Sequence, residues 1–71
     1  MTNRYDSDRM ATDMALRGWL AADLSRVSGV SPMTVSRFLN GQTQTARVAI
    51  RLAAALGYSV RRYLKTAKRA A

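Results

Sequence analysis

The chain has 71 residues, enough for one small domain, and carries 12 Lys and Arg against 4 acidic residues, a net charge of +8. A chain this short buries only about 60% of its unfolded surface, which favours an economical helical core, completed in some proteins by a second subunit. Cysteine and histidine are absent, which excludes disulfides, zinc sites, thiol nucleophiles and histidine bases. Apolar stretches are too short to span a bilayer or form a signal peptide, so we expect a cytoplasmic protein that is not an enzyme.

The charge is divided unevenly along the chain. The first 23 residues hold all 4 acids and have a slightly negative balance, whereas every charged residue from Leu24 onward is basic. Such asymmetry indicates a polyanionic partner. The alternative is a charged surface that serves only solubility, but uncompensated charge would destabilise a domain of this size by self-repulsion.

Four glycines stand where helices are expected to end: Gly18, Gly29, Gly41 and Gly57. Ser7 is a suitable N-cap for a first helix over residues 8–17, with Met10 and Met14 on one face. Residues 1–6 are predicted to be a flexible N-terminus.

The segment after Gly18 predicts a second helix that ends at Gly29. Leu20, Leu24 and Val27 recur at the spacing of a buried helix face. No capping residue stands near Leu20, so the break at Gly18 is either a true boundary or a kink between two helical pieces.

Residues 31–40 predict a third helix with a well-specified start. Ser31 is a good N-cap, Pro32 suits the first helical position, and Val30 can pack on Val35. An apolar face of this helix is formed by Val35, Phe38 and Leu39. The opposite face carries mainly polar side chains: Met33, Ser36, Arg37 and Asn40.

The polar face of the third helix suits contact with duplex DNA. Arg37 can bind O6 and N7 of guanine, Thr34 and Ser36 are short donors for a phosphate backbone, and Met33 can pack on a thymine methyl group. The alternatives are that Met33 is an ordinary exposed or half-buried residue and Ser36 a bystander.

A fourth helix is predicted over residues 44–56. Its narrow apolar stripe consists of Ala49, Leu52, Ala53 and Leu56. At its entrance Gln42, Thr43 and Thr45 can bond phosphates, or one of the two threonines is simply the helix cap.

The C-terminal segment, residues 59–71, predicts a basic helix or tail that opens at Ser59. Its apolar face would hold Val60, Tyr63, Leu64 and Ala67. This segment has three competing roles: packing on the domain or a dimer partner, added phosphate contact, or binding to an anionic membrane. The single Trp and the single Phe are expected in the core rather than as stacking platforms for single strands.

The stretch AADLSRVSGVSPMTVSRFLNG resembles the helix-turn-helix of LacI-type repressors, through its GVSP, TVSR and LNG runs. A looser similarity continues through TARVAIRLAAALGY, and the spacing from Gly18 to Gly29 resembles the Cro/C1 repressor family. The resemblance implies an all-α fold, a compact four- to five-helix bundle of the lambda repressor-like type, with the second helix of the motif in the major groove.

The LacI-type resemblance also implies residue roles. Contact with bases falls on Pro32, Met33 and Arg37, to which we add Gln42. Contact with phosphates falls on Ser31, Thr34, Ser36 and Asn40, to which we add Thr43 and Thr45. Pro32 departs from the family because it offers no side-chain donor.

Two further departures separate the chain from LacI proteins: it has no sugar-binding domain, and SVRRYLKTAKRAA replaces the expected hinge. The acidic N-terminal helix is instead typical of Cro/C1-type domains. The resemblance therefore favours a stand-alone Cro/C1-like regulator, of a kind that fits a phage or mobile element, with its DNA-binding domain over residues 7–58.

The favoured function is that of a sequence-specific, double-stranded DNA-binding transcriptional repressor, a homodimer that reads an inverted repeat with half-sites about 10 to 10.5 bp apart or a multiple of that. One alternative is an antitoxin- or adaptor-like protein-interaction module with only non-specific nucleic-acid binding. Another is RNA or membrane-surface binding through the C-terminal tail. No cofactor, metal or small-molecule ligand is expected.

Overall fold

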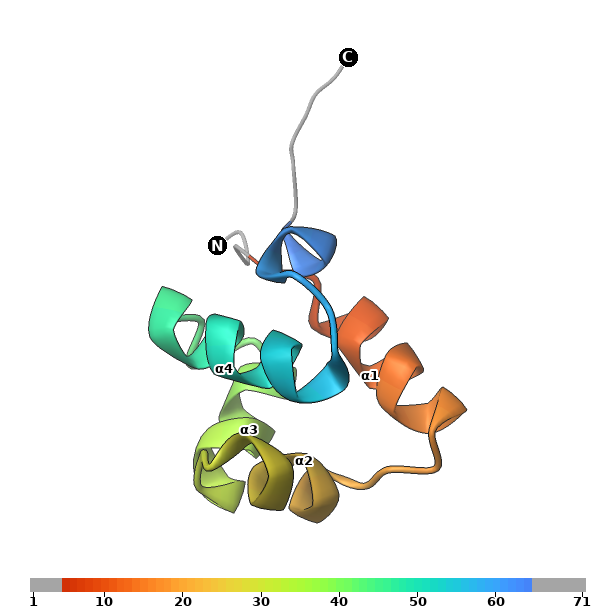
Figure 1. The fold of residues 1–71 in the computed structure, drawn as a ribbon. Helices are drawn as coiled ribbons and strands as arrows, with labels where there is room; N and C mark the ends of the chain where they lie inside the picture. The colour runs from red at the N-terminus through yellow and green to blue at the C-terminus, as the bar shows by residue number, and fades with distance from the viewer. Residues whose placement is uncertain (1–4, 65–71) are drawn as a thin grey trace.

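The computed structural model describes residues 5–64, and within them the fold is all-α, as the sequence predicted (Figure 1). Four α-helices and one short 3-10 helix follow in chain order: α1 (Ser7–Leu16), α2 (Ala21–Ser28), α3 (Pro32–Leu39), α4 (Ala46–Leu56) and η1 (Val60–Tyr63). Helices α2 and α3 pack against one another and against α4, while α1 and η1 close the other side of α4.

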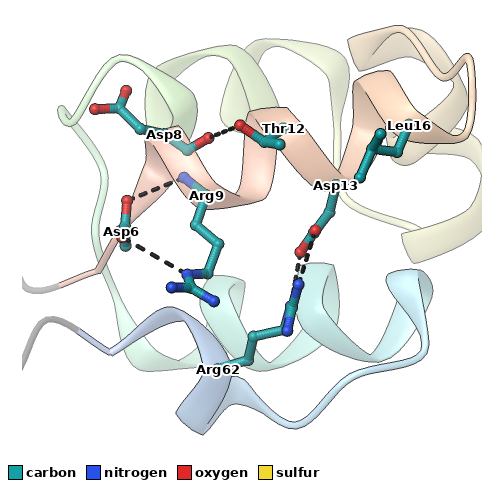
Figure 2. Close-up of a pocket in the computed structure, with 7 residues that line it drawn as sticks. All are labelled: Asp6, Asp8, Arg9, Thr12, Asp13, Leu16 and Arg62. Carbon is teal, nitrogen blue, oxygen red and sulfur yellow. Dashed lines mark hydrogen bonds and ion pairs between the residues drawn. The ribbon is translucent and has the colours of Figure 1, made fainter.

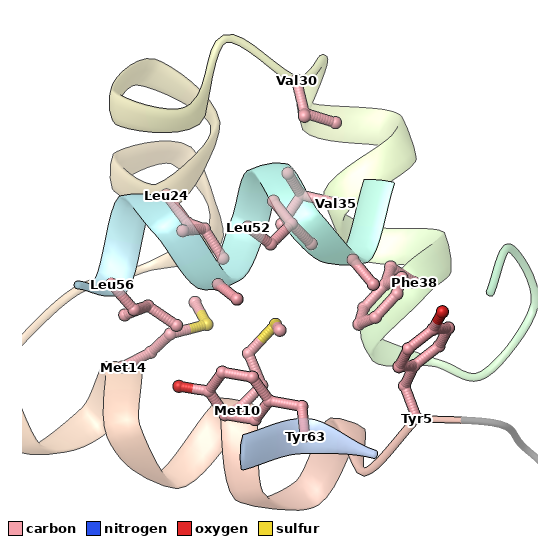
Figure 3. Close-up of a cluster of buried hydrophobic side chains, with 12 residues drawn as sticks. Tyr5, Met10, Met14, Leu24, Val30, Val35, Phe38, Leu52, Leu56 and Tyr63 are labelled. Carbon is pink, nitrogen blue, oxygen red and sulfur yellow. The ribbon is translucent and has the colours of Figure 1, made fainter. Parts of the chain in front are cut away.

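The core lies between the four α-helices and η1 and includes the two expected methionines (Figure 3). Its fully buried large side chains are Met10, Leu24, Val35, Phe38, Leu52, Leu56 and Tyr63. The predicted apolar stripe of α4 is confirmed, since all four of its residues are buried. Small residues in that stripe, Ala49 and Ala53, let the neighbouring helices approach α4 closely.

The start of α3 is confirmed and the start of α1 is corrected. Ser31 caps α3, with its hydroxyl oxygen accepting the N–H of Thr34. In α1 the cap is Asp6, whose carboxylate accepts the N–H of Arg9, and not Ser7, which is the first helical residue and is buried. A carboxylate at this position is stabilised by the helix dipole as well as by the hydrogen bond.

The predicted buried face of α2 was wrong at two of its three positions. Leu24 is buried, but Leu20 and Val27 are exposed. Gly18 marks a true helix boundary, and Leu20 is the extended N-cap residue of α2, with its N–H donated to the Asp23 carboxylate at 2.8 Å. The face turned toward the core is made mostly of small residues, which hydrophobic periodicity does not detect.

Both ends of the described chain join the packed unit. Tyr5 is buried and pairs in an isolated antiparallel bridge with Leu64, so the fold includes residues 5 and 6 of the predicted flexible N-terminus. Ser59 caps the following segment as predicted, but Val60–Tyr63 form only one 3-10 turn, after which Leu64 is extended. The rest of the predicted basic helix, residues 65–71, lies outside the described residues.

Candidate nucleic-acid interface

The connection between α2 and α3 is a tight turn fixed by one glycine and two serines. Gly29 ends α2 in the left-handed region, with φ 78°, where a side chain is strained. The buried hydroxyl of Ser25 donates to the carbonyl of Val30, and the N–H of Val30 donates to the hydroxyl of Ser28 at 3.1 Å. These bonds satisfy the backbone of the turn and fix the angle at which α3 leaves it.

Helix α3 separates its residues into a buried and an exposed face, as the sequence predicted. Val35 and Phe38 are fully buried. Four residues on the other side are exposed: Met33, Ser36, Arg37 and Asn40. Within residues 5–64 the Arg37 guanidinium has no acidic partner, so its charge is available to an external anion.

The hydroxyls at the start of α3 form a short chain. The Ser31 hydroxyl donates to the Thr34 hydroxyl at 2.8 Å while it accepts the Thr34 N–H. The Ser31 hydroxyl is therefore engaged on both sides, and the half-buried Thr34 keeps a hydroxyl proton for an acceptor outside the protein. At the start of α4, Thr45 is the cap and accepts the N–H of Val48.

The loop between α3 and α4 folds back on the end of α3. The N–H of Gln42 donates to the Arg37 carbonyl at 2.8 Å, and that of Thr43 to the same oxygen at 3.4 Å. Gln42 is exposed and Thr43 is half-buried. The structure therefore brings Gln42 and Thr43 to the C-terminal end of α3, next to the turn that carries Arg37, whereas Pro32 and Met33 lie at its N-terminal end.

This arrangement agrees with the comparison with known families. A helix-turn-helix family model, of the Cro/C1 type, matches residues 13–62. The chain belongs to this helix-turn-helix family. Searches of curated proteins and of solved structures each found no match. The family comprises DNA-binding transcription regulators and is not a family of enzymes.

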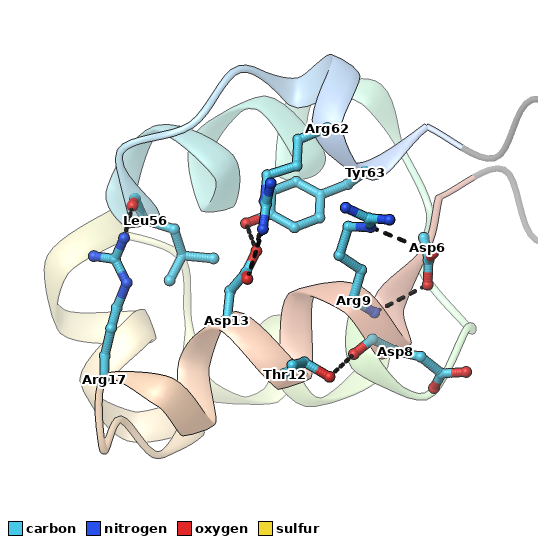
Figure 4. A network of polar contacts seen from close by, with 9 residues as sticks. All are labelled: Asp6, Asp8, Arg9, Thr12, Asp13, Arg17, Leu56, Arg62 and Tyr63. Carbon is cyan, nitrogen blue, oxygen red and sulfur yellow. Dashed lines mark hydrogen bonds and ion pairs between the residues drawn. The ribbon is translucent and has the colours of Figure 1, made fainter.

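On the opposite side of the helix-turn-helix domain, a buried ionic network joins α1 to η1 (Figure 4). The Asp13 carboxylate, 5% exposed, accepts two hydrogen bonds from Arg62, at 2.8 and 3.0 Å, and one from the Tyr63 hydroxyl at 2.6 Å. The hydrogen bond from Arg62 lowers the pKa of Asp13 to about 2, while burial raises the pKa of Tyr63. The one deeply buried acid of the described domain is thereby neutralised.

A second cluster joins the end of α1 to the end of α4. The Arg17 guanidinium donates to the Leu56 carbonyl and lies 5.5 Å from the ring centres of both Trp19 and Tyr58. Arg62 covers Tyr58 at 4.2 Å. Tyr58 is thus engaged by arginines of its own chain, and Trp19 is half-buried against the core rather than fully within it.

An open groove beside this network carries no evident chemistry of its own (Figure 2). It is lined mainly by α1, with Arg62 on its other wall. The Asp13 carboxylate already accepts hydrogen bonds from Arg62 and Tyr63. Residues 5–64 contain no group of acidic residues arranged to hold a metal ion. Among the same residues, no helix has the length and apolar character needed to cross a membrane.

Sequence reasoning missed three residues: Ser25 and Gln44, which fix the segments on either side of α3, and Asp13, which stabilises the opposite side of the domain. Ser25 and Asp13 are polar residues within helices whose partners lie in other elements, so no local pattern reveals them. Gln44 stands within the QTQT stretch, but its amide bonds point into the protein.

Proposed function

We propose that this protein is a sequence-specific regulator of transcription that represses its targets by inserting α3 into the major groove of duplex DNA. The observation that carries the proposal is the exposed face of α3, where Arg37, which has no acidic partner within residues 5–64, stands among small polar side chains on a helix with a fixed start. An arginine so placed fits the O6 and N7 atoms of guanine. The buried face of the same helix keeps it from rotating in the groove.

Base contacts would come from both ends of α3. Arg37 reads guanine, and Gln42, next to the Arg37 turn, reads a neighbouring base through its amide. Met33, 64% exposed, offers an apolar surface to a thymine methyl group, with Pro32 beside it. The LacI-type motif noted in the sequence supports the assignment of Pro32, Met33 and Arg37.

Phosphate contacts would come from hydroxyls and amides around α3. Thr34 has the free hydroxyl proton described above, and Ser36 and Asn40 are exposed on the reading face. The other proposed contacts are Ser31, Thr43 and Thr45. Thr45 caps α4 by accepting the Val48 N–H, so its hydroxyl proton would donate to a phosphate. The Ser31 hydroxyl proton is donated to Thr34, so Ser31 would contribute through the backbone N–H groups at the start of α3.

The protein would bind as a homodimer on an inverted repeat. A single recognition helix of eight residues reads only a few base pairs, and two-fold pairing doubles the site without new chemistry. The half-sites would then be separated by about 10 to 10.5 bp or a multiple of that.

Selection of bound duplexes from a random library at about 150 mM salt tests this proposal, because screening removes most non-specific binding. We expect an enriched palindrome whose half-site spacing gives the dimer geometry. An enriched site without two-fold symmetry would contradict the dimer. Binding that disappears as salt rises, with no enriched sequence, would contradict the regulator and favour a protein-interaction module.

A further inference from the structure

The side chain of Gln44 joins the α3–α4 loop to the last turn of α3 and to Tyr5, which is 39 positions away in the sequence. Its Nε2 donates to the carbonyl of Phe38, in the last turn of α3, at 2.8 Å. Its Oε1 accepts the N–H of Tyr5 at 2.9 Å. This half-buried amide thus donates to α3 through its nitrogen and accepts from Tyr5 through its oxygen.

The contact with Phe38 falls on a carbonyl that the helix leaves open. The last four carbonyls of an α-helix have no partner in the next turn. The Phe38 oxygen accepts the N–H of Gly41 at 3.0 Å and the Gln44 amide on its other side. Together with the bonds from Gln42 and Thr43 to the Arg37 carbonyl, this ties the loop to α3 at two consecutive residues.

The contact with Tyr5 connects the loop to a part of the protein that is held firmly. Tyr5 is 3% exposed, and its ring centre lies 5.8 Å from that of Phe38 (Figure 3). The next residue, Asp6, donates its N–H to the Tyr63 carbonyl, and Tyr5 forms a bridge with Leu64. The Tyr5 N–H therefore has a fixed position set by the core and by η1.

We infer that Gln44 is a positioning residue for DNA binding, which rests on the proposed function. By holding the α3–α4 loop between the Phe38 carbonyl and Tyr5, it sets where Gln42 and Thr43 stand relative to Arg37. Tyr5 thus supports DNA recognition from the side of the protein that carries η1.

The test compares Gln44→Met, which keeps the length and neutrality of the side chain but loses both hydrogen bonds, with a control. The control is Leu56→Val, a buried change in α4 that lowers stability without altering the loop. Three quantities are measured for each: the thermal midpoint, the hydrogen exchange of the Gln42 and Thr43 amides by NMR, and the affinity for the selected duplex. Gln44→Asn, too short to span both partners, replaces Gln44→Met if that variant does not fold.

We expect Gln44→Met to speed exchange of the two loop amides and to weaken DNA binding, each about three- to tenfold, the net effect of a lost hydrogen bond. For Leu56→Val, we expect any change in loop exchange or in DNA affinity to be no larger than its loss of global stability explains. Unchanged loop exchange would overturn the inference, and so would a loosened loop with wild-type affinity.

The inference can fail separately from the proposed function. If the wild-type protein enriches no sequence, the regulator role fails. The role of Gln44 is then decided by two measurements: the hydrogen exchange of the loop amides and the affinity for a random duplex. The second is informative because Thr43 would still contribute a phosphate contact to a random duplex. Retention of wild-type affinity for the random duplex by Gln44→Met would overturn it in that case.

Discussion

The two sides of this domain use charge in opposite ways. Between α1 and η1, Asp13 is almost completely buried and bonded by Arg62 and Tyr63, so its charge is neutralised within the fold. On α3, Arg37 is exposed and has no acidic partner within residues 5–64. The difference indicates that the charges of Asp13 and Arg62 stabilise the domain, whereas the charge of Arg37 is available to an external anion.

This division also explains the asymmetry of the sequence. Three of the four acids pair with a nearby arginine in the structure: Asp6 with Arg9, Asp13 with Arg62, and Asp23 with Arg26. The α1–η1 network is a bidentate bond at 2.8 and 3.0 Å to a buried carboxylate, whereas the other two pairs are largely exposed and contribute little. The excess positive charge remains on the rest of the domain, where a polyanion can bind it.

The largest expected effect is a loss of stability on the α1–η1 side. Asp13→Ala leaves the Tyr63 hydroxyl and the Arg62 guanidinium without their shared acceptor, and we expect the free energy of unfolding to fall by about 2–4 kcal/mol. Chemical denaturation followed by circular dichroism measures it. A change below about 0.5 kcal/mol would mean that the network does not hold η1 in place.

The same network predicts how stability depends on pH. The folded pKa of Asp13 is about 2, below its ordinary value of 3.8, so its contribution is present above about pH 4 and lost as the pH falls from about 4 toward 2. Burial raises the pKa of Tyr63, so its contribution is present below about pH 10 and lost above it. Denaturation at a series of pH values should show the acid loss in wild type and a smaller one in Asp13→Ala.

On the other side, Arg37→Ala should weaken binding to the selected duplex by about 1–3 kcal/mol and relax the preference at one base pair. A matched control is Arg51→Ala, which removes an exposed arginine from α4 outside the proposed base contacts. Fluorescence anisotropy on the selected duplex and on a random duplex separates loss of base reading from a general loss of positive charge. Equal weakening on both duplexes would exclude base reading by Arg37.

A change in the turn between α2 and α3 is expected to have a smaller effect on stability. Gly29→Ala places a side chain in the left-handed region at φ 78°, with no atom within 4 Å of the added carbon, so only backbone strain opposes it. We expect a loss of about 1 kcal/mol in the free energy of unfolding. Gly18→Ala is the matched control, because Gly18 has φ 72° and is equally unobstructed. We expect Gly18→Ala to lose a similar amount of stability and to keep wild-type DNA affinity. Any loss of affinity seen only in Gly29→Ala would then be due to the turn between α2 and α3.

The smallest effect concerns residues 65–71, the part of the basic C-terminal segment that lies outside the described residues. If Lys68 contacts a phosphate, Lys68→Ala should weaken binding to all sequences alike and reduce the slope of log affinity against log salt by about 0.9. Affinity measured at several salt concentrations gives the slope. An unchanged slope would assign this residue a role other than phosphate contact.

The parts of the fold that local chemistry determines could be predicted from the sequence. Ser31 and Pro32 specify the start of α3, and the spacing of Ala49, Leu52 and Leu56 gives the buried stripe of α4. The exposure of Met33 and Arg37 also follows, because these residues lie opposite the apolar face of α3.

The parts that depend on contacts between distant residues could not be predicted. The Asp13–Arg62 pair spans 49 positions and the Tyr5–Gln44 bond spans 39, so neither has a local pattern. In α2 the apolar spacing suggested the wrong face, because packing against α3 and α4 selects the small residues around Leu24. Only one of the two Gln44 contacts is long-range: the bond to Phe38 spans six positions, and the bond to Tyr5 is the one that no local pattern reveals.

The most direct test of the division between the two sides is a matched pair of arginine-to-alanine changes, Arg62→Ala and Arg37→Ala. For each variant, the free energy of unfolding and the Kd for the selected duplex are measured well below the thermal midpoint. We predict that Arg62→Ala mainly lowers the free energy of unfolding and changes the Kd less than Arg37→Ala does, whereas Arg37→Ala raises the Kd and keeps wild-type stability. Two variants that change the same quantity to the same degree would contradict the account.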